Sequence, residues 1–333
     1  MTNLAAPTRD IVVIGASAGG VEALRDLVRG LPSDLPAAVF VVLHIGRHSQ
    51  LAGILGRAGP LPAAEAKDGE PIEHGRIYVA PPDLHLLVHG THVLLRRGPR
   101  ENLSRPAIDP LFRSAACALG PRVIGVVLTG ALGDGTAGLR AIKRCGGLAV
   151  VQDPSDAAVP SMPENALHHV AVDHCVPIAR MAALLVQLVG SPAGDTPVVP
   201  RDIQMEAAIA LQESSTMEKQ DLLGEPAPFS CPECQGPLWQ IEDGDALRFR
   251  CHIGHALSSE AMQAAQGEDI ENTLWRLFRT HRERAELARR LAAKEPPQSV
   301  QADRYNTRAE GYAEDAAIIH RFILGRTDMQ DPF

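Results

Sequence analysis

The chain has 333 residues, enough for two domains or for one domain with an appendage. A hydrophobic content of 45% supports a full core, and the 4% aromatic content indicates an α/β protein packed mainly by Ala, Val and Leu. The formal net charge of −8 argues against general nucleic-acid binding. The N-terminus has no signal-peptide pattern, and no apolar run reaches the roughly 20 residues of a membrane span, so we expect a cytoplasmic protein without membrane insertion.

The first predicted elements are a strand, a glycine-rich turn and a helix. Residues 11–14 are β-branched and apolar, which favours a buried strand. The turn that follows is Gly-Ala-Ser-Ala-Gly-Gly over residues 15–20, and residues 21–28 have helical spacing of their apolar side chains.

Three explanations fit this turn about equally well. In a strand–turn–helix context, Gly-x-Ser-x-Gly forms a nucleophile elbow that exposes Ser17 at the end of the sheet. Backbone amides at the helix start could instead bind a phosphate. A dinucleotide-binding fold would, however, place an acidic residue near the end of the second strand, where this chain has His44. The glycines could also form a structural turn whose serine has no chemical role.

Strands and helices continue to alternate to about residue 190. Strands are predicted over 38–43, 76–80, 123–128 and 148–151, and a hairpin over 85–95. Helices are predicted from near Ser49, from Asp109 to Leu119, over 134–145 and from Ser161; Asp109 is expected to be an N-cap, and 161–164 a capping box. This alternation predicts a mostly parallel, doubly wound α/β sheet with helices on both faces.

Beyond residue 190 the pattern changes. A Gly/Pro-rich linker begins there and leads into a helical connector, so we assign 1–190 to the α/β domain and 191–225 to the linker and connector. A compact Cys/His segment occupies 226–262, and a helical region broken at two prolines occupies 263–333.

Three strand ends of the predicted sheet carry the residues of a hydrolytic triad. Ser17 follows the first strand, His44 ends the second, and Asp134 lies in a glycine-rich turn after the strand over 123–128. Because the carboxyl ends of parallel strands share one edge, these side chains can meet. A serine nucleophile needs a base and a group that orients the base.

Each residue also has a simpler explanation when it is taken singly. His44 could be a satisfied core histidine, and Asp134 could be the N-cap of the next helix. The three together favour catalysis. Their order along the chain, Ser, His, Asp, differs from the order in α/β-hydrolases and in the common serine proteases, which indicates another scaffold.

These residues resemble those of the chemotaxis protein-glutamate methylesterases, the CheB family. The resemblance covers about residues 9–190, and its motifs occur in the right order along the chain. These are the turn over 15–20, the strand end at His44, Arg-Pro-Ala-Ile-Asp-Pro-Leu-Phe over 105–112, Leu-Thr-Gly with Asp-Gly over 128–135 and, more loosely, 153–166. Family members often have Thr where this chain has Ala18, and Met where it has Ala131.

The resemblance implies a function and a role for each residue. Ser17 would be the nucleophile, His44 the general base and Asp134 the residue that orients His44, with backbone amides near Ala18 and Ala131 as oxyanion donors. The family hydrolyses γ-glutamyl methyl esters on methylated chemoreceptor helices, releasing methanol, and can deamidate certain glutamines there. It needs no cofactor for this chemistry. The family archetype carries an N-terminal receiver domain, which we do not expect here.

A second chemical motif lies in the Cys/His segment. Cys231 and Cys234 are followed by Cys251 and His255 in the spacing C-x2-C-x16-C-x3-H. Two close ligand pairs around a short β-like stretch favour a structural zinc ribbon over a redox cysteine pair. His255 is the expected fourth ligand, with His252 as the alternative. Methylesterase-like proteins carry a similar ribbon in C-terminal extensions.

Two other classes of function stay open at this point. The fold could be a catalytically silent scaffold that binds a partner helix, or a nucleotide-binding regulator that uses the glycine loop. For the tail, we expect that it docks other signalling proteins and that hydrolysis of a small ester does not need residues 191–333.

Overall fold

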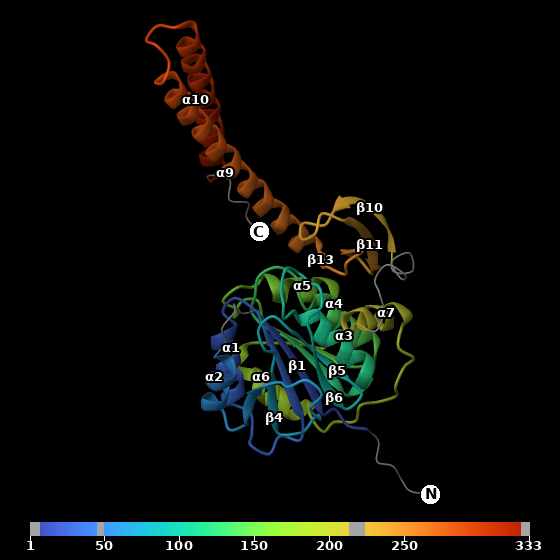
Figure 1. Cartoon of the computed structure of the whole chain (residues 1–333). Helices are drawn as coiled ribbons and strands as arrows, with labels where there is room; N and C mark the ends of the chain where they lie inside the picture. The colour runs from blue at the N-terminus through green and yellow to red at the C-terminus, as the bar shows by residue number, and fades with distance from the viewer. Residues whose placement is uncertain (1–6, 45–49, 213–223, 328–333) are drawn as a thin grey trace, which may run out of the picture. The chain divides into compact units, whose positions relative to one another are not determined.

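The computed structural model describes residues 7–44, 50–212 and 224–327. A seven-stranded parallel sheet forms the centre of the first unit, residues 1–262, in the order β3-β4-β2-β1-β7-β8-β9 (Figure 1). Its strands are β1 (Ile11–Ala16), β2 (Ala38–Leu43), β3 (Ala63–Glu65), β4 (Arg76–Val79), β7 (Val123–Val127), β8 (Leu148–Gln152) and β9 (His174–Val176). The predicted doubly wound α/β fold is confirmed.

Helices cover both faces of this sheet (Figure 1). One face carries α1 (Gly20–Arg29), α2 (Leu51–Ala58) and α6 (Ile178–Leu188). The other carries α3 (Ile108–Leu119), α4 (Thr136–Arg144), α5 (Ser161–His169), α7 (Arg201–Ala210) and the antiparallel hairpin of β5 (His85–His89) and β6 (His92–Arg96). The strands alternate between these two cores: Ile11 and Val13 face the α3 side, and Val12 and Ile14 face the α1 side.

Helix starts are where the sequence-based prediction is least accurate. Helix α2 begins at Leu51, and Ser49, the predicted start, lies outside the described residues. Asp109 is not an N-cap: α3 begins at Ile108, so Asp109 lies inside its first turn. The predicted capping box over 161–164 is also wrong. Pro160 is the N-cap of α5, and the Ser161 hydroxyl donates to the carbonyl of Gly130.

The Cys/His segment folds into a four-stranded antiparallel sheet. Its strands are β10 (Gly224–Ser230), β11 (Pro237–Asp243), β12 (Ala246–Cys251) and β13 (Ala256–Ser258). We call residues 224–258 the ribbon. An apolar cluster fills it, and two leucines of the α/β domain, Leu103 and Leu132, pack against that cluster.

Buried ion pairs join the ribbon to the α/β domain. Glu101 binds Arg113 of α3 and, at 3.2 Å, Arg250 of β12. Glu206 of α7 binds Arg250 at 2.6 Å and Arg248 at 2.9 Å. All five side chains are at most 8% exposed. Burial opposes ionisation of both glutamates, but the arginines more than offset it and hold the pKa of Glu101 and Glu206 below the ordinary value.

These contacts predict that Arg250→Met destabilises the chain by roughly 3 kcal/mol, because its removal leaves buried carboxylates short of a positive charge. Urea unfolding measures this, followed by tryptophan fluorescence in a Trp275→Phe background that leaves Trp239 of β11 as the reporter. Arg97→Met is the matched control, since Arg97 pairs with Asp83 at the surface and its loss should cost less than about 1 kcal/mol. Equal effects of the two substitutions would contradict the structural role of the buried pairs.

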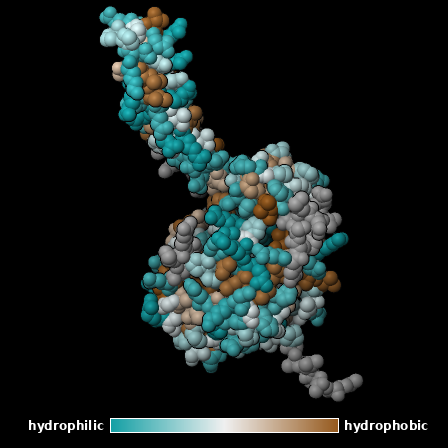
Figure 2. All heavy atoms as spheres, viewed as in Figure 1, coloured by the Kyte–Doolittle hydropathy of each residue, from teal (hydrophilic) through white to brown (hydrophobic). Residues whose placement is uncertain are grey.

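The second unit, residues 263–333, is helical. Helix α9 (Ser259–Ala292) runs into it and is followed by α10 (Val300–Thr327). The two helices contact each other through His281 with Asp315 at 3.2 Å and Arg284 with Tyr312 at 2.6 Å. Figure 2 shows isolated hydrophobic residues among mostly hydrophilic ones on the visible face of these helices. No helix in the described part of the chain is long and apolar enough to cross a bilayer.

Candidate functional site

The three predicted triad residues meet at the carboxyl edge of the parallel sheet. Ala16 and Leu43, the last residues of β1 and β2, are in register, so Ser17 and His44 follow at the same level. His44 Nδ1 lies 3.1 Å from Ser17 Oγ, and His44 Nε2 lies 2.7 Å from Asp134 Oδ2. The structure thus brings all three residues into one hydrogen-bonded chain, with the His44 side chain 17% exposed and Asp134 buried.

Asp134 is held from several sides. The helix that it precedes, α4, has Gly135 as its N-cap, so Asp134 is not the N-cap of that helix. Instead its oxygens accept hydrogen bonds from the amides of Ile108 at 2.7 Å and Asp109 at 3.2 Å, at the start of α3. Burial alone would raise the pKa of Asp134, but its hydrogen bonds, that from His44 first, hold the pKa below the ordinary value. Asp134 is therefore an ionised acceptor.

Two further side chains at this site were not predicted from the sequence. Asn102 Nδ2 donates to Asp134 Oδ1 at 2.9 Å and to Asp109 Oδ2 at 3.0 Å. Asp109 also accepts the amides of Gly135 and Gly138 of the α4 start. Burial, and next the charge of Asp134, raise the pKa of Asp109 to about 7. Nothing in the local sequence marks Asn102, because its role depends on contacts with distant segments.

The nucleophile turn is closely packed. Gly19 has a φ of 75°, and a Cβ there would lie 2.6 Å from the Cβ of Ala158, so both conformation and space require glycine. The Ser17 amide donates to the Thr129 carbonyl at 3.0 Å, and the Thr129 hydroxyl donates to the Ala18 carbonyl at 2.9 Å. The turn after β1 and the loop after β7 are therefore held together.

The same two loops carry the predicted oxyanion donors. Within the described ranges, the amides of Ala18 and Ala131 donate no hydrogen bond to another protein group. Gly130, beside Ala131, lies so close to Ser17 that a Cβ on it would be 2.7 Å from the Ser17 Cβ. One free amide therefore lies in the nucleophile turn, and the other lies in the loop that packs against it.

The four predicted metal ligands also come together. The ligand atoms of Cys231, Cys234, Cys251 and His255 all lie within 4.8 Å of one another. His255 Nδ1 is 3.7 Å from Cys231 Sγ and 3.4 Å from Cys251 Sγ, and the sulfurs of Cys234 and Cys251 are 3.7 Å apart. A tetrahedron with Zn–S of about 2.3 Å and Zn–N of about 2.0 Å has edges of about 3.8 Å between sulfurs and about 3.5 Å from sulfur to nitrogen. The donor set therefore fits zinc.

His252, the alternative ligand, lies elsewhere. Its ring packs against Gly236, where a Cβ would be 2.1 Å from the His252 Cε1. A second group, His168, His169 and Asp245, also lies within ligand distance, but Arg140 binds the same Asp245 carboxylate at 3.1 Å. Ion pairing accounts for that second group.

Comparisons with known proteins identify the domain that carries the triad. The family model described as CheB methylesterase matches residues 12–185. A relative from Leptospira interrogans, named putative protein-glutamate methylesterase/protein-glutamine glutaminase, is 40% identical over 182 residues, which are 54% of this chain and 94% of the relative.

A longer relative from Anaeromyxobacter dehalogenans, named protein-glutamate methylesterase/protein-glutamine glutaminase 2, is 42% identical over 190 residues, 55% of this chain and 56% of its own. Among solved structures, the CheB methylesterase catalytic domain of Thermotoga maritima matches with a TM-score of 0.53 and 33% identity, over 55% of this chain and all of that one. The predicted family and enzyme class, a carboxylic ester hydrolase, are confirmed. The chain belongs to the CheB methylesterase family.

Proposed function

We propose that this protein is a protein-glutamate methylesterase that hydrolyses γ-glutamyl methyl esters on chemoreceptor-like signalling helices, giving glutamate and methanol. The observation that carries this proposal is the hydrogen-bonded chain from Ser17 through His44 to Asp134 within a CheB methylesterase domain. The names of the relatives support the same activity and add glutamine deamidation as a second one. Chemotaxis or a related signalling pathway is the context that fits such a substrate.

In this proposal His44 acts as the base through Nδ1, and two contacts support that choice. An ionised carboxylate can only accept, so Nε2, which faces Asp134, carries the ring proton. Nδ1 then has a free lone pair toward Ser17 and accepts its hydroxyl proton. Asp134 thus fixes the tautomer of His44 and stabilises the imidazolium that forms.

The reaction proceeds in two halves. Ser17 Oγ attacks the ester carbonyl carbon while its proton moves to His44 Nδ1, and the amides of Ala18 and Ala131 stabilise the oxyanion. His44 returns the proton to the departing methoxide, which leaves as methanol, and Ser17 keeps the glutamyl acyl group. A water molecule, deprotonated by Nδ1, then attacks the acyl carbon; the bond to Ser17 Oγ breaks, His44 returns the proton to Ser17, and glutamate is released. With glutamine as substrate, ammonia leaves in place of methanol.

The ribbon is proposed to bind one structural zinc ion through Cys231, Cys234, Cys251 and His255. Four protein ligands leave no open position for a substrate, so zinc would stabilise the fold of the ribbon and take no part in the hydrolysis. The helical region after residue 262 is proposed to contact other signalling proteins.

A comparison of substrates tests the proposed function. We expect the purified chain to release methanol from a methyl-esterified chemoreceptor fragment far faster than from free glutamate γ-methyl ester, because binding energy from the surrounding helix lowers the barrier. Ammonia release from the same fragment carrying glutamine at those sites measures the deamidase activity. Equal turnover of the free ester and the fragment would contradict a protein substrate.

A further inference from the structure

Asn102 is attached to the proposed triad but has no part in the reaction steps above. It is buried, and its Nδ2 donates to both Asp134 and Asp109. We propose that Asn102 is a positioning residue for hydrolysis and that the ribbon holds it in place. This inference rests on the proposed function, because it concerns the reaction of Ser17, His44 and Asp134.

The charges of the two buried carboxylates, Asp134 and Asp109, explain why a hydrogen-bond donor is needed between them. Asp134 must stay ionised and keep its oxygen directed at His44 Nε2, yet a second buried carboxylate, Asp109, lies on the other side of Asn102. Two neighbouring carboxylates in a buried site compete for one proton. The two N–H groups of the Asn102 side-chain Nδ2 donate to one carboxylate each and stabilise both. Without them, each carboxylate loses a donor, and Asp134 holds His44 less well.

The ribbon fixes the orientation of the Asn102 amide. The backbone N–H of Ser258 donates to Asn102 Oδ1 at 2.9 Å. The backbone N–H of Asn102 in turn donates to the carbonyl of Ala256 at 2.8 Å, which holds the Asn102 main chain against strand β13. Because strand β13 occupies the oxygen of the side chain, both hydrogens of Nδ2 point at the carboxylates. A flipped amide would direct its oxygen at two carboxylates and lose the bond to Ser258.

The ribbon also packs on the two loops that flank Asp134. Leu103, next to Asn102, and Leu132, two residues before Asp134, both contact the apolar cluster of the ribbon. Both have left-handed backbone conformations, with φ of 65° and 64°. Such conformations are unfavourable for leucine and persist where packing imposes them. The ribbon therefore helps to shape the loop that carries Ala131 and Asp134.

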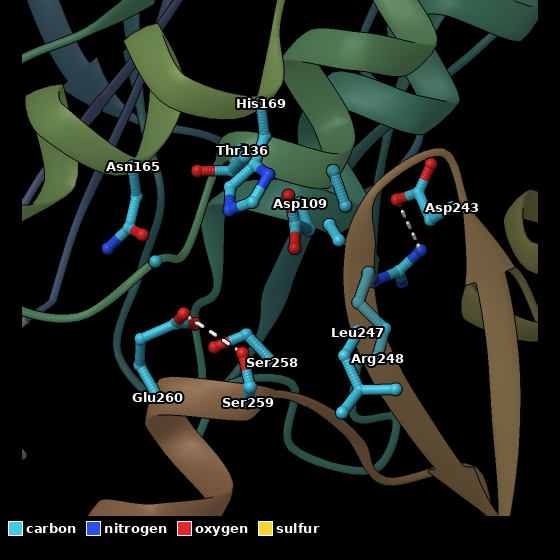
Figure 3. A pocket seen from close by; sticks show the side chains of 13 residues that line it. Asp109, Thr136, Asn165, His169, Asp243, Leu247, Arg248, Ser258, Ser259 and Glu260 are labelled. Atoms are coloured by element: carbon cyan, nitrogen blue, oxygen red, sulfur yellow. Dashed lines mark hydrogen bonds and ion pairs between the residues drawn. The ribbon is translucent and has the colours of Figure 1, made fainter.

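Figure 3 shows this junction from the side of a small cavity. Ser258, Ser259 and Glu260 face Asn165 and Asp109 across it. Asn165 Nδ2 donates to the carbonyl of Leu132 at 3.1 Å, which fixes the same loop from the α5 side. The loop before Asp134 is thus supported by both the ribbon and α5.

A buried charge links Asn102 to the predicted metal site. Glu101, the preceding residue, binds Arg250 Nη2 at 3.2 Å, and Arg250 Nη1 donates to the carbonyl of Gly254 at 2.9 Å. Gly254 lies between the predicted ligands Cys251 and His255. We call residues 251–255 the knuckle. Its fold sets the position of Arg250 through the Gly254 carbonyl, and Arg250 in turn positions Glu101 and the turn that carries Asn102. This predicts that catalysis depends on the ribbon, in contrast to the independent appendage expected from the sequence.

The first test is Asn102→Ala in the full-length chain. We expect kcat for methanol release from a methyl-esterified receptor fragment to fall about 10- to 100-fold, the effect of losing one hydrogen bond to a charged group. KM should stay within about two-fold, because Asn102 does not touch the substrate. By NMR, the proton on His44 Nε2 should shift, which a purely structural role of Asn102 would not cause.

The second test separates the ribbon from Asn102 itself. Ser258→Pro removes the backbone N–H that holds Asn102 Oδ1 and the hydroxyl that accepts the Ala261 amide, and its ring also fixes the local φ. Ser258→Ala, the matched control, removes the hydroxyl alone. We expect Ser258→Pro to lower kcat about 10-fold or more and Ser258→Ala to leave it within about two-fold. Combined with Asn102→Ala, Ser258→Pro should cause no further loss, since both act through one contact.

The outcomes separate this inference from the proposed function. A wild-type chain that releases no methanol contradicts the proposed function, while the His44 proton still reports whether Asn102 positions the triad. Wild-type kcat and an unshifted His44 proton in folded Asn102→Ala would overturn the role of Asn102. Wild-type kcat in folded Ser258→Pro would overturn the role of the ribbon. If Ser258→Pro does not fold, Arg250→Met, which loosens the same turn through Glu101, replaces it in the comparison.

Discussion

Folded Ser17→Ala protein is expected to hydrolyse glutamyl methyl esters about 10³- to 10⁶-fold more slowly than the wild type. The substitution removes the atom that forms the acyl-enzyme, and a methyl group cannot replace it. Ser17 lies at the edge of the sheet, and its hydroxyl makes a hydrogen bond with His44. Because that bond does not hold the core together, the fold should persist. Circular dichroism and thermal unfolding check that the variant is folded, and a methanol assay measures the rate.

The other triad residues provide a sharper test, because a triad acts as a unit. His44→Ala should be as slow as Ser17→Ala, and the double variant should be no slower than either single one. Asp134→Asn should lose about 10⁴-fold, within the same range, since the base remains but its tautomer is no longer fixed. Losses that multiply in the double variant would contradict a shared function of Ser17 and His44.

Removal of the metal ligands has the second largest expected effect. In the Cys231→Ser/Cys234→Ser variant we expect the one zinc ion per chain to be lost and the ribbon to unfold, because zinc binding by such sites is worth on the order of 10–16 kcal/mol. Elemental analysis measures the metal, and hydrogen exchange of strands β10–β13 measures the fold. Since the ribbon holds Asn102, kcat should also fall, by at least the 10-fold expected for Asn102→Ala.

The two histidines of the knuckle provide the matched control. His255→Ala should lose the metal and the protection of the ribbon from exchange, because His255 Nδ1 lies among the three sulfurs. His252→Ala should retain both, since its ring packs against Gly236 away from the ligand cluster. Zinc retained by His255→Ala and lost from His252→Ala would reverse the assignment.

The sequence was sufficient to predict the fold and the residues that meet at its edge. Residues 11–16 and 38–43 are apolar and rich in β-branched side chains, and they alternate with amphipathic helices, which predicts a parallel sheet. Once the strands are parallel, Ser17, His44 and Asp134 must lie at one edge. Predicting the metal ligands depended only on spacing. The strand ends and the metal ligands are therefore both predicted from patterns that extend over only a few neighbouring residues.

The role of Asn102 could not be predicted in this way. Its partners Asp134 and Ser258 are 32 and 156 residues away, so no local pattern marks it. The sequence predicts Asp109 as an N-cap because it precedes a proline at a helix start, yet it accepts the amides of Gly135 and Gly138. A carboxylate near a helix start has the same sequence signature in both roles.

The junction between the α/β domain and the ribbon was also not predicted. Glu101, Glu206, Arg248 and Arg250 are charged, and charged residues usually lie in solvent. Here Arg250 pairs with Glu101 and Glu206, which lie 149 and 44 residues before it in the chain. Such pairing depends on the three-dimensional placement of complementary charges, which composition and periodicity do not contain.

The central claim, that Ser17 catalyses the hydrolysis of glutamyl methyl esters, is tested most directly by product analysis. Wild-type and Ser17→Ala protein are each incubated with the same methyl-esterified receptor fragment, while methanol and the mass of every esterified peptide are measured. The wild type should convert each ester to glutamate with one methanol released per ester lost, and Ser17→Ala should leave the esters intact over the same time. Ester loss at equal rates in both proteins, or none in the folded wild type, would contradict the claim.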